Sequence, residues 1–376
     1  MQLAAPRVLL CLLAVLLVHP LSALAATRDA ADEATRRFIA KTMKQRGIPG
    51  MQVAVVKDGR VVFSEAHGLA NVENKVAATA TTLFPINSAT KAFTGVAIMQ
   101  LVEAGKVDLD APVSTYLQQL PAAWQGIRVR QLLAHTSGLP DIVDADGLVG
   151  GGSEAQAWQV VEQQPMQALP GAQFVYNQTN YGLLARIIAQ RSGKTYEDYL
   201  ASGQFEPLGM GHVTFGDSYD LVPNAATMYS FFPRSSDAAD APPRLSHWFY
   251  DMPHGLWAGG GIQASAGDLA QWLAALLQHR VLSAESLARM WTPERLNDGS
   301  VGAWSAGWPV SEAQGRRQIS SFGGARAALL VYPDEGLAVV VLTNLVGANP
   351  QQFTAQIADF HRLQRSAEPR SAERPM

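Results

Sequence analysis

Apolar segments with the length and composition of β-strands lie near both ends of the chain. Residues 51–56 and 61–65 form a first pair, and the Asp-Gly dipeptide between them is a strong hairpin signal. Residues 326–332 and 337–343 form a second pair around a Pro-Asp-Glu-Gly turn, and residues 318–322 are a candidate strand before them. The pattern therefore predicts strands from both chain ends.

Helices accompany these strands. Residues 28–46 read as an amphipathic helix, and residues 351–363 read as a closing helix. The simplest packing joins the two end regions, about 26–83 and 310–363, into one antiparallel sheet covered by both terminal helices. Together with a helical middle region, this predicts an α+β fold, a sandwich of sheet and helices.

The middle of the chain, about residues 84–309, is predicted to be mainly helical. Residues 179–191 and 267–278 carry apolar positions at helical spacing. Two irregular stretches interrupt this region, at residues 141–153 and 231–248, and surface loops are their default interpretation. Whether the second stretch covers a site stays open at this point.

The N-terminus has the pattern of an export signal. Arg7 supplies a positive end, residues 8–18 are an unbroken apolar run, and residues 23–25 fit the small-x-small pattern of a cleavage site. The run is short for a bilayer span, so an uncleaved anchor is the weaker alternative. We expect residues 1–25 to be removed and the protein to be periplasmic or secreted, without stable membrane insertion. Since Cys11 is the only cysteine, disulfides and thiol chemistry would then be excluded.

Composition and charge narrow the classes of function. The 376 residues are 48% hydrophobic and 16% charged, which permits a large core. The net charge of −3 gives no electrostatic basis for binding nucleic acid or an anionic membrane surface. The polar tail, residues 364–376, is predicted to be disordered.

Ser88 and Lys91 are the first candidates for chemistry. If Ser88 opens a helix, the two side chains lie one turn apart on one face. A hydroxyl is a poor nucleophile until a base takes its proton, and a neighbouring amine can do so. Taken alone, Ser88 as an ordinary helix N-cap beside a solvated Lys91 is the favoured interpretation. The helical positions that follow are Phe93, Val96, Ala97, Leu101 and Ala104.

Other mechanisms have weaker support. A Ser-His-Asp triad is the rival arrangement, but no Gly-x-Ser-x-Gly elbow is present. The eight histidines are scattered, without paired metal-ligand spacing. Gly259–Gly261 lacks the ending of a phosphate-binding loop. We therefore expect no metal and no organic cofactor.

Several sequence blocks follow one another along the chain, at residues 84–95, 131–140, 170–171, 174–181, 259–262, 323–324 and 342–344. Their order and spacing resemble the serine β-lactamase superfamily over roughly residues 35–345. They are most similar to the branch that contains class C β-lactamases, D-alanyl-D-alanine carboxypeptidases and β-lactamase-like esterases. This resemblance implies a β-lactamase/transpeptidase-like fold, with residues 26–363 forming one serine hydrolase domain.

The resemblance assigns roles to the first two motifs. Ser88 and Lys91 match the Ser-x-x-Lys motif and become nucleophile and base. Tyr176 matches the tyrosine of the Tyr-x-Asn motif, and by resemblance it shares proton transfer with Lys91. Gln178 stands where Asn is usual. Its amide can hold a substrate carbonyl or the Lys91 amine, but the side chain is one methylene longer, which changes the position that the amide reaches. His135 matches a family position that is structural.

The third motif departs from the family pattern. Ser321 replaces the usual Lys or His, while Gly323 and Gly324 still allow a strand to approach the substrate closely. By resemblance, the Gly324 N–H is the second donor of an oxyanion hole, beside the Ser88 N–H. Arg326 can substitute for the missing cation, although a solvated edge charge is the favoured interpretation. The loss of the cation argues against β-lactam or peptidoglycan substrates and for neutral esters or amides.

These features together predict an exported serine hydrolase that forms an acyl-enzyme with a small ester, amide or peptide-like substrate, esterase-like in preference. One alternative is a β-lactamase or D-amino-acid peptidase acting on cell-wall fragments. Another is a catalytically inactive binding protein with the same fold. The sequence does not determine the natural substrate or the oligomeric state.

Overall fold

The fold is centred on a seven-stranded antiparallel sheet. The computed structural model describes residues 11–362 except 235, 236 and 239. The order of the sheet is β11-β12-β13-β14-β1-β2-β3, so strands from the two chain ends meet where β14 pairs with β1. The predicted joining of both end regions into one sheet is therefore confirmed. Its strands are β1 (Gly50–Lys57), β2 (Arg60–Asn71), β3 (Val76–Ala77), β11 (Val310–Ala313), β12 (Arg316–Gly323), β13 (Ala327–Tyr332) and β14 (Leu337–Thr343).

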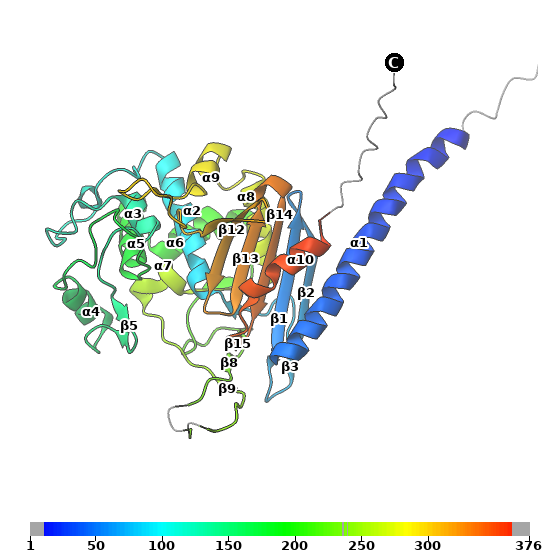
Figure 1. The fold of residues 1–376 in the computed structure, drawn as a ribbon, viewed down its shortest axis with the longest axis horizontal. Helices are drawn as coiled ribbons and strands as arrows, with labels where there is room; N and C mark the ends of the chain where they lie inside the picture. The colour runs from blue at the N-terminus through cyan, green and yellow to red at the C-terminus, as the bar shows by residue number, and fades with distance from the viewer. Residues whose placement is uncertain (1–10, 235–236, 239, 363–376) are drawn as a thin grey trace, which may run out of the picture.

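Strand alternation gives the sheet two buried faces. In β1, Val53 and Val55 belong to a smaller apolar cluster with Ile39 and Ile357, whereas Ala54 faces the main core. The central strands β13 and β14 are buried at every position because each face of the sheet is covered. Helix α1 (Cys11–Arg46) and helix α10 (Thr354–Phe360) cover the first face, and the helical half of the molecule covers the second (Figure 1).

The helical half is built around the buried helix α2. The predicted helices at 179–191 and 267–278 are present as α5 and α8, with boundaries shifted by one residue. Its helices are α2 (Thr90–Glu103), α3 (Val129–Leu133), α4 (Glu154–Val161), α5 (Thr179–Ser192), α6 (Tyr196–Leu200), α7 (Trp257–Gly260), α8 (Ala266–Leu277) and α9 (Ala284–Met290).

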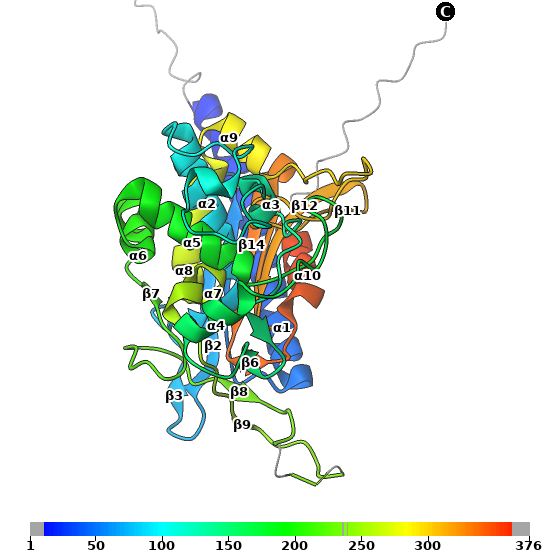
Figure 2. The same ribbon diagram turned by 90° about the vertical axis from the view of Figure 1, so that its left-hand side faces the viewer.

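Small sheets connect the two halves. The first has the order β4-β10-β7, with β4 (Phe84–Pro85) leading directly into the turn that carries Ser88. The second has the order β15-β8-β9, and it lies at the opposite edge of the molecule from α9 (Figure 2). The remaining strands are β5 (Val143–Asp144), β6 (Gly147–Leu148), β7 (Val213–Phe215), β8 (Tyr229–Ser230), β9 (Ser246–His247), β10 (Ile262–Ala264) and β15 (Leu345–Val346).

Several predicted elements differ from the structure. The predicted helix 28–46 is the C-terminal part of α1, which begins at Cys11, and the predicted strand 61–65 continues to Asn71 in β2. The closing helix is shorter than predicted, because residues 350–352 form a 3-10 turn and Phe353 leaves helical geometry before α10 begins. The irregular stretch 141–153 contains the short hairpin of β5 and β6.

The predictions for the chain ends lie partly outside the described residues. Residues 1–10 of the predicted signal and the tail 364–376 belong there, while residues 11–25 begin α1. Within the described residues, no helix combines the length and hydrophobicity needed to cross a bilayer.

Candidate active site

Ser88 is the accessible position in an otherwise buried segment. Every other residue from Thr82 to Met99 is buried, while Ser88 is half-buried. It lies in a 3-10 turn, residues 87–89, which follows β4 and leads into α2. Ala89 is the N-cap of α2, and the Ser88 hydroxyl makes no capping hydrogen bond. The interpretation of Ser88 as an ordinary N-cap is therefore wrong.

Tyr176 is the hydrogen-bond partner of Ser88. Its hydroxyl donates to Ser88 Oγ at 2.8 Å, across 88 residues of sequence. The segment around it is fixed by its neighbour Asn177, which is buried and donates through Nδ2 to the Leu139 carbonyl at 3.0 Å. The His135 ring lies 4.3 Å from the Tyr176 ring, centroid to centroid. The phenol is thus held against the serine by packing and by backbone contacts.

Lys91 is buried against the aromatic rings of Tyr176 and Tyr181. It is 0% exposed, and its Nζ donates to Gln178 Oε1 at 2.9 Å and to the Gly259 carbonyl at 2.8 Å. The same nitrogen lies 4.8 Å from the Tyr176 ring centroid and 5.0 Å from that of Tyr181. No carboxylate of the described residues lies within 4.0 Å of it. Two neutral acceptors and two aromatic faces therefore surround the amine.

The structure distinguishes between the two uses predicted for the Gln178 amide. Its Oε1 accepts from Lys91 instead of standing free for a substrate carbonyl, and its backbone N–H donates to Asp141 Oδ1 at 2.8 Å. A Cβ on Gly259 would lie 2.6 Å from this same oxygen. Glycine at 259 is therefore needed for the Lys91–Gln178 contact to form.

The electrostatics favour a reactive phenol. Burial raises the pKa of Tyr176, but the charge of Lys91 and the hydrogen bond with Ser88 outweigh it, so this pKa lies below its ordinary value of 10.0. Burial, reinforced by Lys91, holds the pKa of His135 well below 6.5. His135 is therefore neutral, and its Nδ1 accepts from the Asn177 N–H at 3.3 Å. Ser88 receives its contact from a phenol, which gives the rival Ser-His-Asp arrangement no support.

Strand β12 passes directly beside the serine turn. A Cβ on Gly323 would lie 1.7 Å from the Ile86 carbonyl oxygen, so only glycine permits this approach. Ser321 is 2% exposed, and its Oγ lies 3.5 Å from the Ala89 carbonyl oxygen. Ser321 therefore faces the start of α2 and offers no cation there.

Gly324 follows at the turn between β12 and β13. A Cβ on Gly324 would lie 2.8 Å from Oδ1 of Asn87, the residue before Ser88. Among the described residues, the N–H groups of Ser88 and Gly324 donate to no backbone acceptor outside the regular elements. Free N–H groups are what an oxyanion hole requires. The oxyanion role of this pair stays a prediction.

Arg326 belongs to the same neighbourhood. It is 2% exposed, and its Nε donates to Asn87 Oδ1 at 2.6 Å. Its guanidinium carbon lies 4.7 Å from the ring centroid of Tyr250. The interpretation of Arg326 as a solvated edge charge is wrong, because the tight turn at 324–326 directs the side chain inward before strand alternation begins.

Sequence reasoning did not include Asn87 among the site residues. Asn87 has a φ of 46°, in the left-handed region that Asn tolerates better than most residues. An Asn directly before the candidate nucleophile was the available signal. Its contact with Arg326 spans 239 residues and had no local signal.

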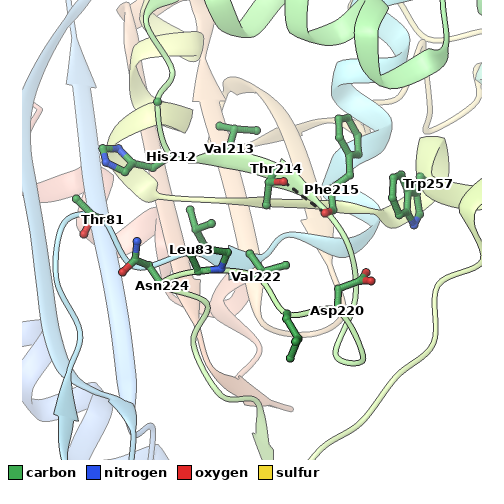
Figure 3. A pocket seen from close by; sticks show the side chains of 13 residues that line it. Thr81, Leu83, His212, Val213, Thr214, Phe215, Asp220, Val222, Asn224 and Trp257 are labelled. Atoms are coloured by element: carbon green, nitrogen blue, oxygen red, sulfur yellow. Dashed lines mark hydrogen bonds between the residues drawn. The ribbon is translucent and has the colours of Figure 1, made fainter.

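Figure 3 shows a pocket of about 480 Å³ that does not coincide with the site around Ser88. It is lined by β7, by residues 220–224 and by Trp257, and the lining does not include Ser88, Lys91 or Tyr176. Trp257 begins α7, the helix whose Gly259 carbonyl binds Lys91. Among the described residues, no group of three His, Cys, Asp or Glu side chains is arranged to hold a metal ion.

Comparison with known proteins places the chain in a family. PbpX of Bacillus subtilis (strain 168), a putative penicillin-binding protein, is 31% identical over 273 residues, which cover 73% of this chain and 65% of that protein. The chain thus spans slightly less than two thirds of this relative's length. The octameric penicillin-binding protein homologue of Pyrococcus abyssi is 28% identical, with a TM-score of 0.71 over 86% of this chain and 75% of that one.

A third comparison concerns the fold alone. EstCE1, a hydrolase with promiscuous acyltransferase activity, is 21% identical, with a TM-score of 0.72 over 89% of this chain and 98% of that one. These likenesses confirm the predicted β-lactamase/transpeptidase-like fold. The Beta-lactamase family matches residues 35–364. The chain therefore belongs to the beta-lactamase family, and this membership supports a serine hydrolase in general.

Proposed function

We propose that this protein hydrolyses a small carboxylic ester or amide through an acyl-enzyme formed on Ser88. The observation that carries this is the 2.8 Å hydrogen bond between the Tyr176 hydroxyl and Ser88 Oγ, with the Lys91 amine 4.8 Å from the tyrosine ring. A nucleophile, a proton carrier and a nearby cation thus meet at the accessible position of a buried segment. That combination is the arrangement of nucleophilic catalysis.

The contacts suggest a division of labour between Tyr176 and Lys91. Tyr176, as phenolate, takes the Ser88 proton while Ser88 Oγ bonds to the substrate carbonyl carbon. The tyrosine then returns the proton to the leaving alcohol or amine as the carbonyl bond to it breaks. A water molecule then attacks the resulting ester of Ser88 and loses its proton to Tyr176. The tyrosine returns this proton to Ser88 Oγ as the bond between Oγ and the acyl carbon breaks, which releases the carboxylic acid product and restores the phenolate. Lys91, held by Gln178 and Gly259, favours the phenolate by its charge in both halves of the cycle.

The negative charge on the former carbonyl oxygen is assigned to two N–H donors, those of Ser88 and Gly324. Both lie at the junction between the serine turn and strand β12, where Gly323 permits close approach. Donors fixed before the reaction stabilise a developing oxyanion without reorganisation. No metal or organic cofactor takes part in these steps.

An ester is favoured over a β-lactam because the third motif has Ser321 in place of a cation. The second candidate is a β-lactamase or D-amino-acid peptidase, favoured by the likeness to the penicillin-binding protein homologue of Pyrococcus abyssi. Parallel assays with short p-nitrophenyl esters and a chromogenic cephalosporin separate these two. We expect ester turnover to exceed cephalosporin turnover, and the reverse order would favour the second candidate.

Labelling by a fluorophosphonate tests the nucleophile itself. The wild-type protein is expected to be labelled, and Ser88→Ala is expected to lose both labelling and ester turnover. Ser300→Ala, a change on an exposed loop, is the matched control and should retain both. Labelling that persists in Ser88→Ala would contradict the assignment. Turnover that is absent from the wild type across the ester and cephalosporin panels would favour a binding protein.

Export is a further part of this proposal, motivated by the apolar run that precedes Ala23, Leu24 and Ala25. We expect the mature protein to begin at Ala26 and to accumulate outside the cytoplasm. Mass spectrometry of the purified N-terminus after expression in a bacterial host checks this. A full-length N-terminus in the cytoplasmic fraction would contradict it.

A further inference from the structure

Gln178 is hydrogen-bonded to two side chains of opposite charge. Its Oε1 accepts from Lys91 Nζ at 2.9 Å, and its backbone N–H donates to Asp141 Oδ1 at 2.8 Å. Lys91 is fully buried, and Asp141 is half-buried. Within the described part of the chain, neither side chain has an opposite charge within 4.0 Å. One residue of the candidate site therefore connects an ammonium group to a carboxylate that does not contact it.

The Asp141 carboxylate is held at the start of helix α5. Its Oδ1 also accepts from the Val143 N–H at 3.3 Å, while the Ile142 N–H donates to Thr179 Oγ1 at 2.8 Å. Gln178 is the N-cap of α5, and its own side chain makes no capping hydrogen bond. Asp141 accepts from a backbone N–H there instead, at the helix end that favours a negative charge. The carboxylate is thus fixed in position and stabilised in its ionised form.

Asp141 and Lys91 also interact through their charges. Burial raises the pKa of Asp141, whereas hydrogen bonds from backbone N–H groups and the charge of Lys91 lower it. The interaction between two charges is mutual, so the carboxylate favours the ammonium form of Lys91 as much as the ammonium favours the carboxylate. A buried amine needs such support, because burial disfavours its charged form.

The other ionisable groups described around Lys91, apart from the reacting phenol, carry no negative charge. Burial, reinforced by the charge of Lys91, holds the pKa of His135 well below 6.5, so its imidazole is neutral. Burial raises the pKa of Tyr181 well above 10.0, so its phenol keeps its proton. Helix α7 has no ionisable side chain, and β12 approaches the start of α2 with the uncharged residues 321–323. Among these described neighbours of Lys91, Asp141 therefore supplies the negative charge.

We propose that Asp141 is a positioning residue for the reaction, because its carboxylate stabilises the ammonium form of Lys91 that favours the Tyr176 phenolate. This inference rests on the proposed hydrolase function. With one proton shared between the two groups, the site holds either a neutral amine and a neutral phenol or an ammonium and a phenolate. The carboxylate favours the second pair through the ammonium. Since it lies beyond contact distance, it leaves the charge of Lys91 to act on the Tyr176 ring, 4.8 Å away.

A double-mutant cycle on the full chain measures this coupling. Asp141→Asn removes the charge and keeps an oxygen that accepts from the backbone N–H groups. In the wild-type background, we expect kcat for p-nitrophenyl acetate to fall roughly 10-fold, a typical size for the interaction of two partly buried charges that do not touch. In the Lys91→Met background the ammonium is absent, and the carboxylate then only opposes the phenolate. Asp141→Asn should therefore leave kcat unchanged or slightly raised there.

The control is an equal change of charge nearby. Asp144→Asn, at an exposed position in the adjoining strand β5, should keep the kcat of its parent in both backgrounds. Thermal unfolding of each variant checks that the fold is kept. If Asp141→Asn does not fold, Asp141→Ser replaces it in the same cycle, because its hydroxyl can also accept from a backbone N–H.

Two results would overturn the inference. A kcat of Asp141→Asn equal to or above that of the wild type would mean that the carboxylate does not support Lys91. An equal fall in both backgrounds would limit Asp141 to holding the start of α5. Failure of the hydrolase function itself appears differently, as absent ester turnover by the wild type together with absent Ser88-dependent labelling.

Discussion

Two buried cations lie near Ser88, and their surroundings differ. Lys91 donates to two neutral oxygens and lies against two tyrosine rings. Arg326 donates one hydrogen bond, lies against one tyrosine ring and keeps a buried nitrogen without a partner. Neither has a carboxylate within 4.0 Å among the residues the structure describes. The protein therefore supplies two acceptors to Lys91, whereas it leaves a buried nitrogen of Arg326 without one.

The difference separates two uses of a buried positive charge. Lys91 is held by two acceptors of the protein, and its charge acts on Tyr176, whose pKa lies below its ordinary value. Arg326 donates through Nε to Asn87, so it acts on the turn that carries Ser88. We therefore expect Lys91 to act on proton transfer by Tyr176, and Arg326 to act on the position of the turn that carries Ser88.

The largest expected effect follows from removing the group that Lys91 acts on. Tyr176→Phe deletes the hydroxyl that contacts Ser88 while keeping the packing against His135. We expect kcat for p-nitrophenyl esters to fall on the order of 10³-fold, within the range of lost acid–base catalysis. The exposed residue Tyr219 gives the matched control, Tyr219→Phe, which should keep full activity. A Tyr176→Phe variant within a few-fold of wild type would separate Tyr176 from the proton transfer.

The next effect concerns the Lys91 charge and its sign. Lys91→Met removes the cation that lowers the pKa of Tyr176, so this pKa rises and less phenolate is present at any given pH. The ascending limb of the pH–kcat profile should move to higher pH, with kcat at neutral pH lowered on the order of 10²-fold. Lys44→Met, a change on an exposed part of α1, is the control. A shift of the limb to lower pH would show that Lys91 does not stabilise the phenolate.

A third test changes the contact between strand β12 and the turn that carries Ser88. Gly323→Ala puts a methyl group where the Ile86 carbonyl lies, so β12 and the serine turn must separate. We expect kcat/KM to fall roughly 100-fold, because small misplacements of reacting groups are costly. Gly211→Ala has open space around the added methyl group and should behave as wild type. Equal activity of the two variants would mean that the close approach is not needed.

The smallest effect contrasts the two cations in stability. Lys91→Met removes a buried charge that no carboxylate of the described residues contacts, but it leaves two acceptors, Gln178 Oε1 and the Gly259 carbonyl, without their donor. We expect it to lower the free energy of unfolding by about 2 kcal/mol. Arg326→Met loses one hydrogen bond but also removes an unpaired buried charge, so a change within about 1 kcal/mol is expected. Denaturant unfolding of both variants without substrate measures this. A larger loss for Arg326→Met would indicate that the protein itself compensates the Arg326 charge.

Much of the fold could be predicted from local pattern. The strands at 51–56, 326–332 and 337–343 were recognisable because burial on both faces leaves a continuous apolar run. The closing helix was overestimated because Phe353 is apolar and fits helical spacing, although its backbone leaves the helix. The spacing of apolar residues indicates which positions are buried, but it does not determine the backbone angles at each position.

The candidate site was predictable where its residues are close in sequence or belong to recognisable blocks. Ser88 and Lys91 lie three positions apart, and Tyr176 lies in a block of its own. The Gln178 amide was recognised as a partner for Lys91 without a choice between its two uses. Gly259, which lies in α7, was not predicted as a site residue, because nothing local indicates that its carbonyl accepts from an amine 168 residues away.

The sequence by itself determined the element types, the antiparallel joining of the two ends and the identity of the serine, lysine and tyrosine. The tertiary structure alone decided that Tyr176 contacts Ser88, that Gln178 binds Lys91, and that Arg326 turns inward onto Asn87. The physical reason is that periodicity encodes which face of an element is buried. The contact between two turns 239 residues apart depends on how whole strands and helices pack, and no local pattern carries that information.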